Sequence, residues 1–595
     1  MASLVKTLLA GSLFVFASVH AGVATHRGSS RDSSLHARSG PVVTVKNGSY
    51  EGVHSSEYGQ DFFLGMRYSQ PAARFSLAQP LNSTWKWTKP ATAYPVSCVG
   101  YGGDNIGYEM SEDCLYLNVI RPAGIDETAE LPYMGGSQDR RYNLSFIVQN
   151  SVELDTPMIG VSINYRVSAF GFLAGSEALE AGIANNGFRD QRLALQWINE
   201  NIGSFGGDPE KVTIWGESSG AESVSAQVLA YNGRDDGLFR AAIGQSGFGG
   251  VLSRFPGGAN NTEAMDALYN LFVSNTSCAS TANTPASLDC LRSLPFDEVN
   301  AALNGTEAAP WPPMLDGDFI TDQATVADFP VNQLHDGRFP KIPILIGTNT
   351  DEGSAFGQGK GPNGTGVDTD DEMRSAIEAI LGPDAPTQTG KSLDGLADEL
   401  LALYPDVQAV GVPSLEKFPV IEAGDSIATA LGLQFRRTGA LFGDFEFQYL
   451  RRRANIAWSN AGLPSYSYEF NVVSTGVPNY IGATHFAEVM FVFDNVLATG
   501  YDSTTVPITD EPAEYAALAK GISDAWVNFV TGLDPNGAGL EIDGVAAWPV
   551  YNATEGGGVG RNVLLDTNGS SVAWDSYRAE GINWMIENSL AVFGN

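Results

Sequence analysis

Residues 158–245 constrain the fold of this 595-residue chain more than any other stretch, because extended and helical patterns alternate there. Residues 158–165, 211–215 and 241–243 are apolar runs typical of buried strands. Between them, residues 188–202 repeat apolar side chains at helical spacing, and residues 219–230 are small residues suited to a helix. This alternation predicts an α/β fold: a mostly parallel sheet with helices on both faces and a ligand site beyond the carboxyl ends of the strands.

A glycine-flanked serine lies between the second predicted strand and the helix that follows it. The sequence Gly216-Glu217-Ser218-Ser219-Gly220 is a G-x-S-x-G motif. A nucleophilic serine requires a tight turn that lifts its Oγ above the sheet, and glycines on either side remove Cβ atoms that would clash there. The motif predicts Ser218 as a nucleophile, with the amides that open the helix at Ser219 directed at a developing oxyanion.

A serine nucleophile requires a general base, and the chain has six histidines: His20, His26, His36, His54, His335 and His485. The first three lie in a predicted signal and leader. In α/β-hydrolases the serine, the acid and the histidine follow in that chain order, which eliminates His54. His335 lies in a polar turn, whereas His485 precedes an apolar helix-like run. The sequence therefore favours His485 as the base.

The acid that orients this histidine should follow a strand between Ser218 and His485. Residues 344–349 form such a strand pattern, and Asp351-Glu352-Gly353 follows it. Either carboxylate could orient His485 and stabilise its imidazolium. The residues alone leave Asp351 and Glu352 as alternatives.

Two long motifs resemble those of the type-B carboxylesterases and lipases, a family that includes cholinesterases and secreted fungal lipases. Residues 205–220 match the family's serine signature, and residues 112–119 (Glu-Asp-Cys-Leu-Tyr-Leu-Asn-Val) match its second signature. The similarity extends from about residue 43 to the C-terminus. It implies an α/β-hydrolase fold and hydrolysis of carboxylic esters through an acyl-enzyme, with no metal and no organic cofactor.

The resemblance also assigns individual residues. The family's acid maps to Glu352, its base to His485, and its early disulfide to Cys98 with Cys114. Ser246 maps to a serine beside the acid, and Glu217 is expected to support the same site. The backbone N–H of Ser219 maps to an oxyanion donor.

One departure from the family follows Leu131-Pro132. Family members continue there with a buried strand and a glycine-rich oxyanion loop, but this chain passes directly to Tyr133, Met134, Gly135 and Gly136, so that about ten residues are missing. We expect Gly135 and Gly136 to be what remains of the loop, and the strand to be absent. Either catalytic power is lost or the translated sequence is faulty. The second reading is favoured, because loss of a central strand would leave buried backbone groups unpaired.

The N-terminal residues and the cysteines of the chain predict that the protein enters the secretory route. Residues 1–21 have the layout of a cleaved signal peptide, residues 22–42 read as a disordered leader, and residues 43–595 as a single catalytic domain. Four cysteines allow three pairings, of which the sequence-local one is Cys98–Cys114 with Cys278–Cys290. Glycosylation sequons begin at Asn47, Asn82, Asn143, Asn260, Asn275, Asn304, Asn363, Asn552 and Asn568.

Net charge restricts the partners. With 34 basic and 68 acidic residues the net charge is −34, which disfavours nucleic acid. No segment is long and apolar enough for stable membrane insertion after signal removal.

The expected partner is a small-molecule or lipid ester, and no feature of the sequence defines an oligomeric state. Two alternatives remain: a triacylglycerol lipase proper, or a non-catalytic cholinesterase-like binding module.

The loop between Cys98 and Cys114 generates a prediction about substrate state. In lipases of the family the corresponding loop forms a long lid, whereas here it holds only 15 residues, few of them apolar. Such a loop covers too little apolar surface to make opening depend on a lipid interface. We expect activity on a sparingly soluble ester to show little jump as the substrate passes from monomers to emulsion droplets. A steep rise at the solubility limit, lost when the loop is replaced by glycines, would contradict this.

Overall fold

The computed structural model of the protein describes residues 40–101, 107–125, 131–134, 139–250, 258–304, 311–321, 330–501 and 505–594. Within these ranges, eleven strands form one large sheet: β3 Val53–Ser55, β4 Gln60–Arg67, β8 Tyr116–Pro122, β9 Leu131–Met134, β10 Ile159–Ile163, β11 Gly207–Glu217, β12 Ala241–Gln245, β13 Ile344–Asn349, β14 Ser465–Phe470, β15 Arg561–Leu565 and β16 Ser571–Trp574. A small three-stranded sheet contains β1 Val42–Val45, β2 Gly48–Glu51 and β5 Lys89–Pro90. A two-stranded sheet contains β6 Ser97–Cys98 and β7 Met110–Ser111.

The large sheet is mixed, with a parallel centre. Its strand order is β16-β15-β14-β13-β12-β11-β9-β10-β8-β4-β3, parallel from β15 to β10 and antiparallel toward both edges. The strands predicted at 158–165, 211–215, 241–243 and 344–349 are β10, β11, β12 and β13. The α/β prediction is confirmed.

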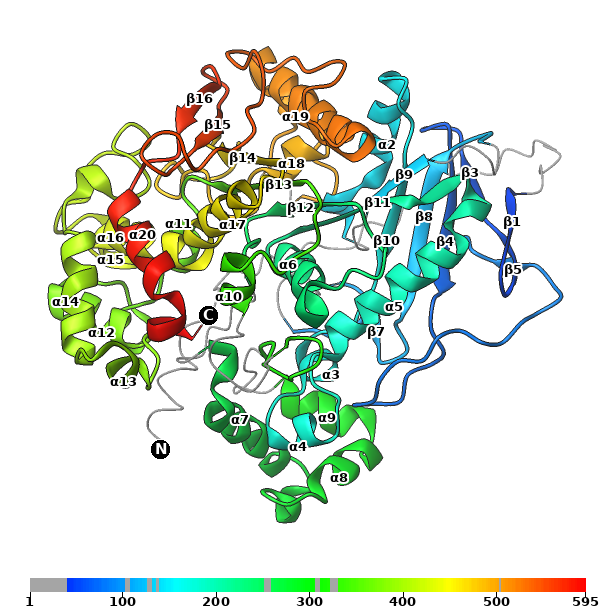
Figure 1. Ribbon diagram of the computed structural model, residues 1–595, viewed down its shortest axis with the longest axis horizontal. Coiled ribbons are helices and arrows are strands. Elements are labelled where there is room, and N and C mark those ends of the chain that lie inside the picture. The colour runs from blue at the N-terminus through cyan, green and yellow to red at the C-terminus, as the bar shows by residue number, and fades with distance from the viewer. Residues whose placement is uncertain are drawn as a thin grey trace.

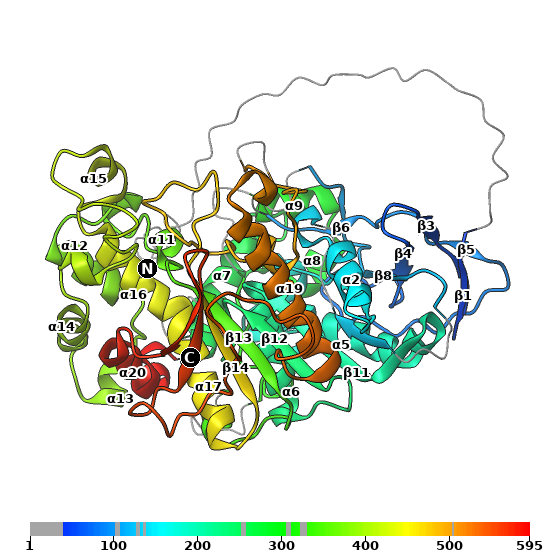
Figure 2. The ribbon, with the colours of Figure 1, turned by 90° about the horizontal axis from the view of Figure 1, so that it is seen from above.

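Helices cover both faces of the sheet. Their bounds are α2 Leu144–Glu153, α3 Ser168–Phe172, α4 Ser176–Glu180, α5 Asn186–Asn201, α6 Ser219–Gly233, α7 Thr262–Ser274, α8 Ser287–Ser293, α9 Phe296–Leu303, α10 Pro330–His335, α11 Gly353–Phe356, α12 Asp370–Glu378, α13 Ala385–Thr389, α14 Leu393–Leu403, α15 Ser426–Leu431, α16 Phe435–Gly443, α17 Tyr449–Asn460, α18 Val489–Val492, α19 Ala513–Gly532 and α20 Ala579–Asn588. In Figure 1, α2, α18 and α19 lie above the sheet and α5, α6 and α10 below it. In both views α12 to α16 form a group beside the strands (Figure 2). Among the described residues, no helix combines the length and apolarity needed to cross a bilayer.

Alternation along the central strands explains the two helical layers. Ile344 and Ile346 of β13 pack in one apolar cluster with residues of α5, α6 and α17. Leu345, between them, packs in a second cluster with residues of α2, α18 and α19. Because successive side chains of a strand point to opposite faces, a strand apolar at every position is buried on both sides.

The predicted absence of the strand after Pro132 is wrong. Leu131–Met134 themselves form β9, which lies between β10 and β11 and is parallel to both. Tyr133 is in register with Ile159 on one side and with Val212 on the other. A short strand is sufficient to pair both neighbours, so the argument from unpaired backbone groups no longer supports a faulty translation. Gly135 and Gly136 lie outside the described residues.

A buried ion cluster connects α17 to the end of the sheet. Arg451 and Arg452 each donate to Asp575 Oδ1, at 2.8 and 2.9 Å, and all three side chains are at most 2% exposed. Tyr551 donates to Asp575 Oδ2 at 3.1 Å, and Arg451 also donates to Ser467 Oγ of β14 at 2.7 Å. Burial opposes ionisation of Asp575, but the two guanidinium groups lower its pKa below the usual value.

This cluster generates a stability prediction. Asp575→Ala would leave two buried guanidinium groups without a countercharge, and breaking a buried ion pair from one side costs about 3 to 5 kcal/mol. We expect a loss of that size in the free energy of unfolding, measured by urea denaturation. Asp289→Ala is the control, because the Asp289 side chain is 85% exposed in its pair with Arg292 and should change stability little. Equal losses for the two variants would contradict the account.

Candidate active site

The turn that carries Ser218 is a strained junction between β11 and α6. Ser218 has φ 56° and ψ −124°, a conformation rarely adopted by residues other than glycine. Its N–H donates to Gln245 O at 2.9 Å, which ties the turn to the end of β12. A Cβ on Gly216 would overlap the backbone of Gly220, so glycine is required at 216. The expectation that both flanking glycines avoid a clash is half wrong, because a Cβ on Gly220 would meet nothing within 4 Å.

Three side chains from distant segments form a continuous hydrogen-bond chain at the carboxyl ends of the strands. Ser218 Oγ lies 2.7 Å from His485 Nε2, and His485 Nδ1 lies 2.7 Å from Glu352 Oε2. Ser218 follows β11, Glu352 follows β13, and His485 lies between β14 and α18. This order and these distances match a nucleophile, a base and an acid that orients the base.

The two other histidines that follow the predicted leader have different partners. His335 Nδ1 lies 3.0 Å from Asp336 Oδ1, and its side chain is 85% exposed. His54 Nδ1 lies 3.0 Å from Asp61 Oδ1 on the β3–β4 hairpin. Neither histidine belongs to the hydrogen-bond chain of Ser218.

Geometry separates the two acidic neighbours that the residues alone left open. Glu352 Oε1 accepts hydrogen bonds from Ser246 Oγ at 2.5 Å and from the Asn349 N–H at 2.8 Å, while its Oε2 faces His485. Asp351 instead accepts from the Ala483 N–H at 2.8 Å. The structure therefore places Glu352 against the histidine and Ser246 beside Glu352.

Glu217 lies close to the same imidazole. Its Oε1 is 3.4 Å from His485 Nε2, and Tyr142 donates to its Oε2 at 3.1 Å. Burial raises the pKa of Glu217 to about 8, an effect opposed by His485 and added to by the carboxyls of Glu488 and Glu352. Glu217 is thus a buried carboxyl beside the same ring nitrogen that Ser218 contacts.

The imidazole of His485 is enclosed by aromatic rings and carboxyls. Phe447 stacks on it at 4.7 Å between centroids, and Phe356 meets it edge-on at 5.0 Å. Burial alone would lower the pKa of His485, but Glu217 and Glu352 outweigh it and raise the pKa to about 9. The carboxyls therefore favour the imidazolium that proton abstraction from Ser218 would create.

Sequence reasoning missed a third buried carboxyl, Glu488. Gln245 donates to its Oε1 at 2.9 Å and Asn349 to its Oε2 at 2.7 Å. Burial raises its pKa, as does the charge of Glu352. The signal that could have found it was a single acidic residue in the apolar run that follows His485, three positions along the chain.

Ser219 begins α6, where the first-turn amides of a helix have no intrahelical acceptor. Its position directly after Ser218 suits a donor to an oxyanion. Gly135 and Gly136, the other predicted donors, lie outside the described residues.

The four cysteines form the sequence-local pairs Cys98–Cys114 and Cys278–Cys290, as predicted.

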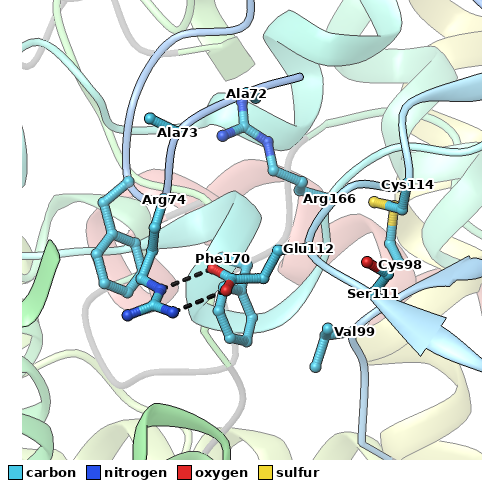
Figure 3. A pocket seen from close by; sticks show the side chains of 11 residues that line it. Ala72, Ala73, Arg74, Cys98, Val99, Ser111, Glu112, Cys114, Arg166 and Phe170 are labelled. Carbon is cyan, nitrogen blue, oxygen red and sulfur yellow. Dashed lines mark hydrogen bonds and ion pairs between the residues drawn. A yellow bond between two sulfur atoms is a disulfide. The ribbon is translucent and has the colours of Figure 1, made fainter. Parts of the chain in front are cut away.

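Beside the Cys98–Cys114 disulfide, a cavity of about 10 Å³ is lined by the Arg74–Glu112 ion pair (Figure 3). Space of this size holds at most one water molecule, and no residue of the Ser218–His485–Glu352 chain lines it.

The sequons differ in exposure. Asn47 is 6% exposed, and its Nδ2 donates to Leu81 O and Ser83 O, so its interpretation as a surface glycosylation position is wrong. Asn143 and Asn552 are half-buried, and the side chain of Asn260 lies outside the described set. The exposed asparagines are Asn82, Asn275, Asn304, Asn363 and Asn568.

Comparisons with known proteins agree on one family. The carboxylesterase family model matches residues 39–561. Lipase 4 of Diutina rugosa is 33% identical over 81% of this chain and 80% of its own length. Secreted lipase 1 of Botryotinia fuckeliana is 29% identical over 94% of this chain and 95% of its own length. The crystal structure of Aspergillus niger EstA superposes with a TM-score of 0.72 at 25% identity, covering 93% of this chain and 99% of that one.

The contact between Glu217 and His485 generates a prediction about titration. Glu217→Gln removes the first of the carboxyl charges that raise the pKa of His485, so that pKa should fall from about 9 toward 6.5. NMR titration of the histidine ring protons measures the shift directly. The ring-proton signals of His335, which is exposed and paired with Asp336, serve as an internal control that the substitution should not affect. An unchanged or higher pKa for His485 would refute the assigned cause.

Proposed function

Because this chain belongs to the carboxylesterase family, we propose that it is a secreted serine carboxylic ester hydrolase in which Ser218 is the nucleophile. The observation that carries the proposal is the unbroken chain from Ser218 Oγ through His485 to Glu352, with 2.7 Å at both links. A hydroxyl hydrogen-bonded to an imidazole that is itself bonded to a carboxylate is the arrangement that activates serine.

The reaction proceeds in two steps. Ser218 Oγ attacks the acyl carbon of the ester as its proton passes to His485 Nε2, and Glu352 stabilises the imidazolium. His485 then returns the proton to the departing alcohol, leaving an acyl-enzyme on Ser218. In the second step His485 deprotonates a water molecule, which attacks the acyl carbon and releases the carboxylic acid.

Charge on the tetrahedral oxygen requires hydrogen-bond donors. The Ser219 N–H supplies one, because it opens α6 immediately after the nucleophile. Gly135 and Gly136 supply others in this proposal, from the segment that follows β9. In the chain these two glycines directly follow β9, whose last residue, Met134, is paired with Gly160 of β10.

Features of the sequence, the disulfides and the comparisons support secretion and a single catalytic unit. Residues 1–21 carry the signal pattern, and the Cys98–Cys114 and Cys278–Cys290 disulfides suit an oxidising compartment. A relative that aligns over nearly its whole length is itself a secreted lipase. The family match begins at residue 39, close to the end of the predicted leader, and continues to residue 561, where β15 begins.

Triacylglycerol hydrolysis is the second candidate within the same chemistry, favoured by the fungal relatives that are lipases. A non-catalytic binding module is disfavoured, because an ordered serine, base and acid serve no purpose in adhesion. Comparing turnover on p-nitrophenyl esters of increasing chain length with turnover on triacylglycerols separates lipase from esterase.

The assigned roles predict a sharp contrast between two histidines. Ser218→Ala and His485→Ala should each lower turnover of p-nitrophenyl butyrate by roughly 10⁴-fold or more, since members of a catalytic triad act as a unit. His335→Ala should leave turnover within twofold, because that side chain is 85% exposed and its ring is paired with Asp336. Loss of turnover in His335→Ala with retention in His485→Ala would reassign the base.

A further inference from the structure

Lys417 lies behind the acid and base of the site, on a segment that the mechanism above does not use. Its Nζ donates to Asp351 Oδ2 at 2.5 Å, to Thr350 Oγ1 at 2.9 Å and to Asn471 Oδ1 at 2.6 Å. The Lys417 side chain is 13% exposed and that of Asp351 is 2% exposed. This ammonium group is therefore the countercharge of a buried carboxylate.

Asp351 is bonded to the backbone that leads to His485. The Asp351 N–H donates to Ala483 O at 3.0 Å, and the Ala483 N–H donates back to Asp351 Oδ2 at 2.8 Å. The approach is so close that a Cβ on Gly482 would overlap the Asp351 carboxylate, and Gly482 has a φ of 72°, which favours glycine. Asp351 Oδ2 thus accepts from both Lys417 and Ala483, and so joins the segment that bears Lys417 to the loop that leads to His485.

This junction lies directly behind the reacting groups. Asp351 immediately precedes Glu352, and Ala483 is two residues before His485. Asp351 thus joins the residue next to Glu352 to the backbone two residues before His485, whose Nδ1 lies 2.7 Å from Glu352 Oε2. The next residue of the histidine loop, Thr484, is held in addition by Ser354 Oγ and by Asn349 Nδ2.

We propose that Lys417 is a positioning residue for ester hydrolysis: through Asp351 it holds the loop 482–485 at the distance at which His485 bonds both Glu352 and Ser218. The proposal rests on the proposed roles of those three residues. Without Lys417, the Asp351 carboxylate would lose its hydrogen-bonded countercharge and keep only the more distant charge of Arg436, so it would draw water or move outward, carrying Ala483 with it.

The segment that bears Lys417 is itself anchored. Arg436, 1% exposed on α16, donates through Nη2 to Phe418 O and to Pro419 O. Phe418 meets Tyr480, two residues before the loop 482–485, at 5.8 Å between ring centroids. Lys417 is thus presented from a fixed backbone, as a positioning contact requires.

Lys417→Met tests the proposal. We expect kcat for p-nitrophenyl butyrate to fall about 10- to 100-fold with KM within twofold, because a displacement of about 1 Å at the reacting groups costs roughly 10²-fold in rate. The downfield proton NMR signal of the His485 Nδ1–H, which reports its short bond to Glu352, should weaken or move upfield. A purely structural role for Lys417 would lower stability without moving that signal.

Lys417→Met combined with Asp351→Asn distinguishes positioning from damage. The asparagine amide at this position retains an oxygen that can accept from the Ala483 N–H, yet leaves no buried charge, so the double variant should recover most of the lost kcat. Lys520→Met is the matched control, since Lys520 Nζ also lies 2.5 Å from a buried carboxylate, that of Asp524 on α19, and its other acidic neighbour is Glu153 on α2. It should lower the melting temperature and leave kcat unchanged.

The outcomes separate this proposal from the proposed function. If wild-type protein hydrolyses the ester and Lys417→Met retains kcat within twofold, or the double variant is no faster than the single one, the positioning role is overturned. If wild-type protein itself shows no turnover and no labelling by a fluorophosphonate, the proposed function has failed instead.

Discussion

The hydrogen bond between His485 and Glu352 is the contact on which the site depends, because it joins segments 133 residues apart in the chain. Neither residue could take its place without the parallel register of β13 and β14, whose carboxyl ends bring their following loops together. Ser218 enters from β11, two strands away from β13, on a turn whose backbone is strained. The fold therefore fixes the positions of all three groups before any substrate arrives.

Burying three carboxyls, those of Glu217, Glu352 and Glu488, around the His485 imidazole costs folding free energy. Hydrogen bonds from the surrounding polar groups offset this cost. Glu352 accepts from Ser246 and from the Asn349 N–H, and Glu488 accepts from Gln245 and from the Asn349 side chain. A buried charge without such donors would cost several kcal/mol. The same carboxyls raise the pKa of His485, so the groups that burden folding also favour the imidazolium formed during proton transfer.

Local patterns predicted those parts of the structure that depend on local order. The alternation of strands and helices from 158 to 245, and the nucleophile turn at Ser218, both follow from short-range periodicity and turn chemistry, and the structure contains them as predicted. His485 could be chosen because few histidines were present. The residues alone left Asp351 and Glu352 as alternatives, the family resemblance selected Glu352, and the structure has Glu352 Oε2 2.7 Å from His485 Nδ1.

Long-range pairing accounts for the remaining differences. Leu131–Met134 are too few to read as a strand, yet their neighbours β10 and β11 supply both hydrogen-bonding edges. Asn47 reads as a surface sequon, but its amide satisfies carbonyls more than thirty residues away. Glu488 and Lys417 are ordinary in sequence and matter only because the fold brings them behind His485.

The central claim is that Ser218 becomes acylated, and the most direct measurement is to locate the covalent adduct. Protein treated with a fluorophosphonate at neutral pH, digested and examined by mass spectrometry, should carry the phosphonyl group on the peptide that contains Ser218, with one group per chain. An adduct on another residue, or none on protein that hydrolyses p-nitrophenyl butyrate, would contradict the account.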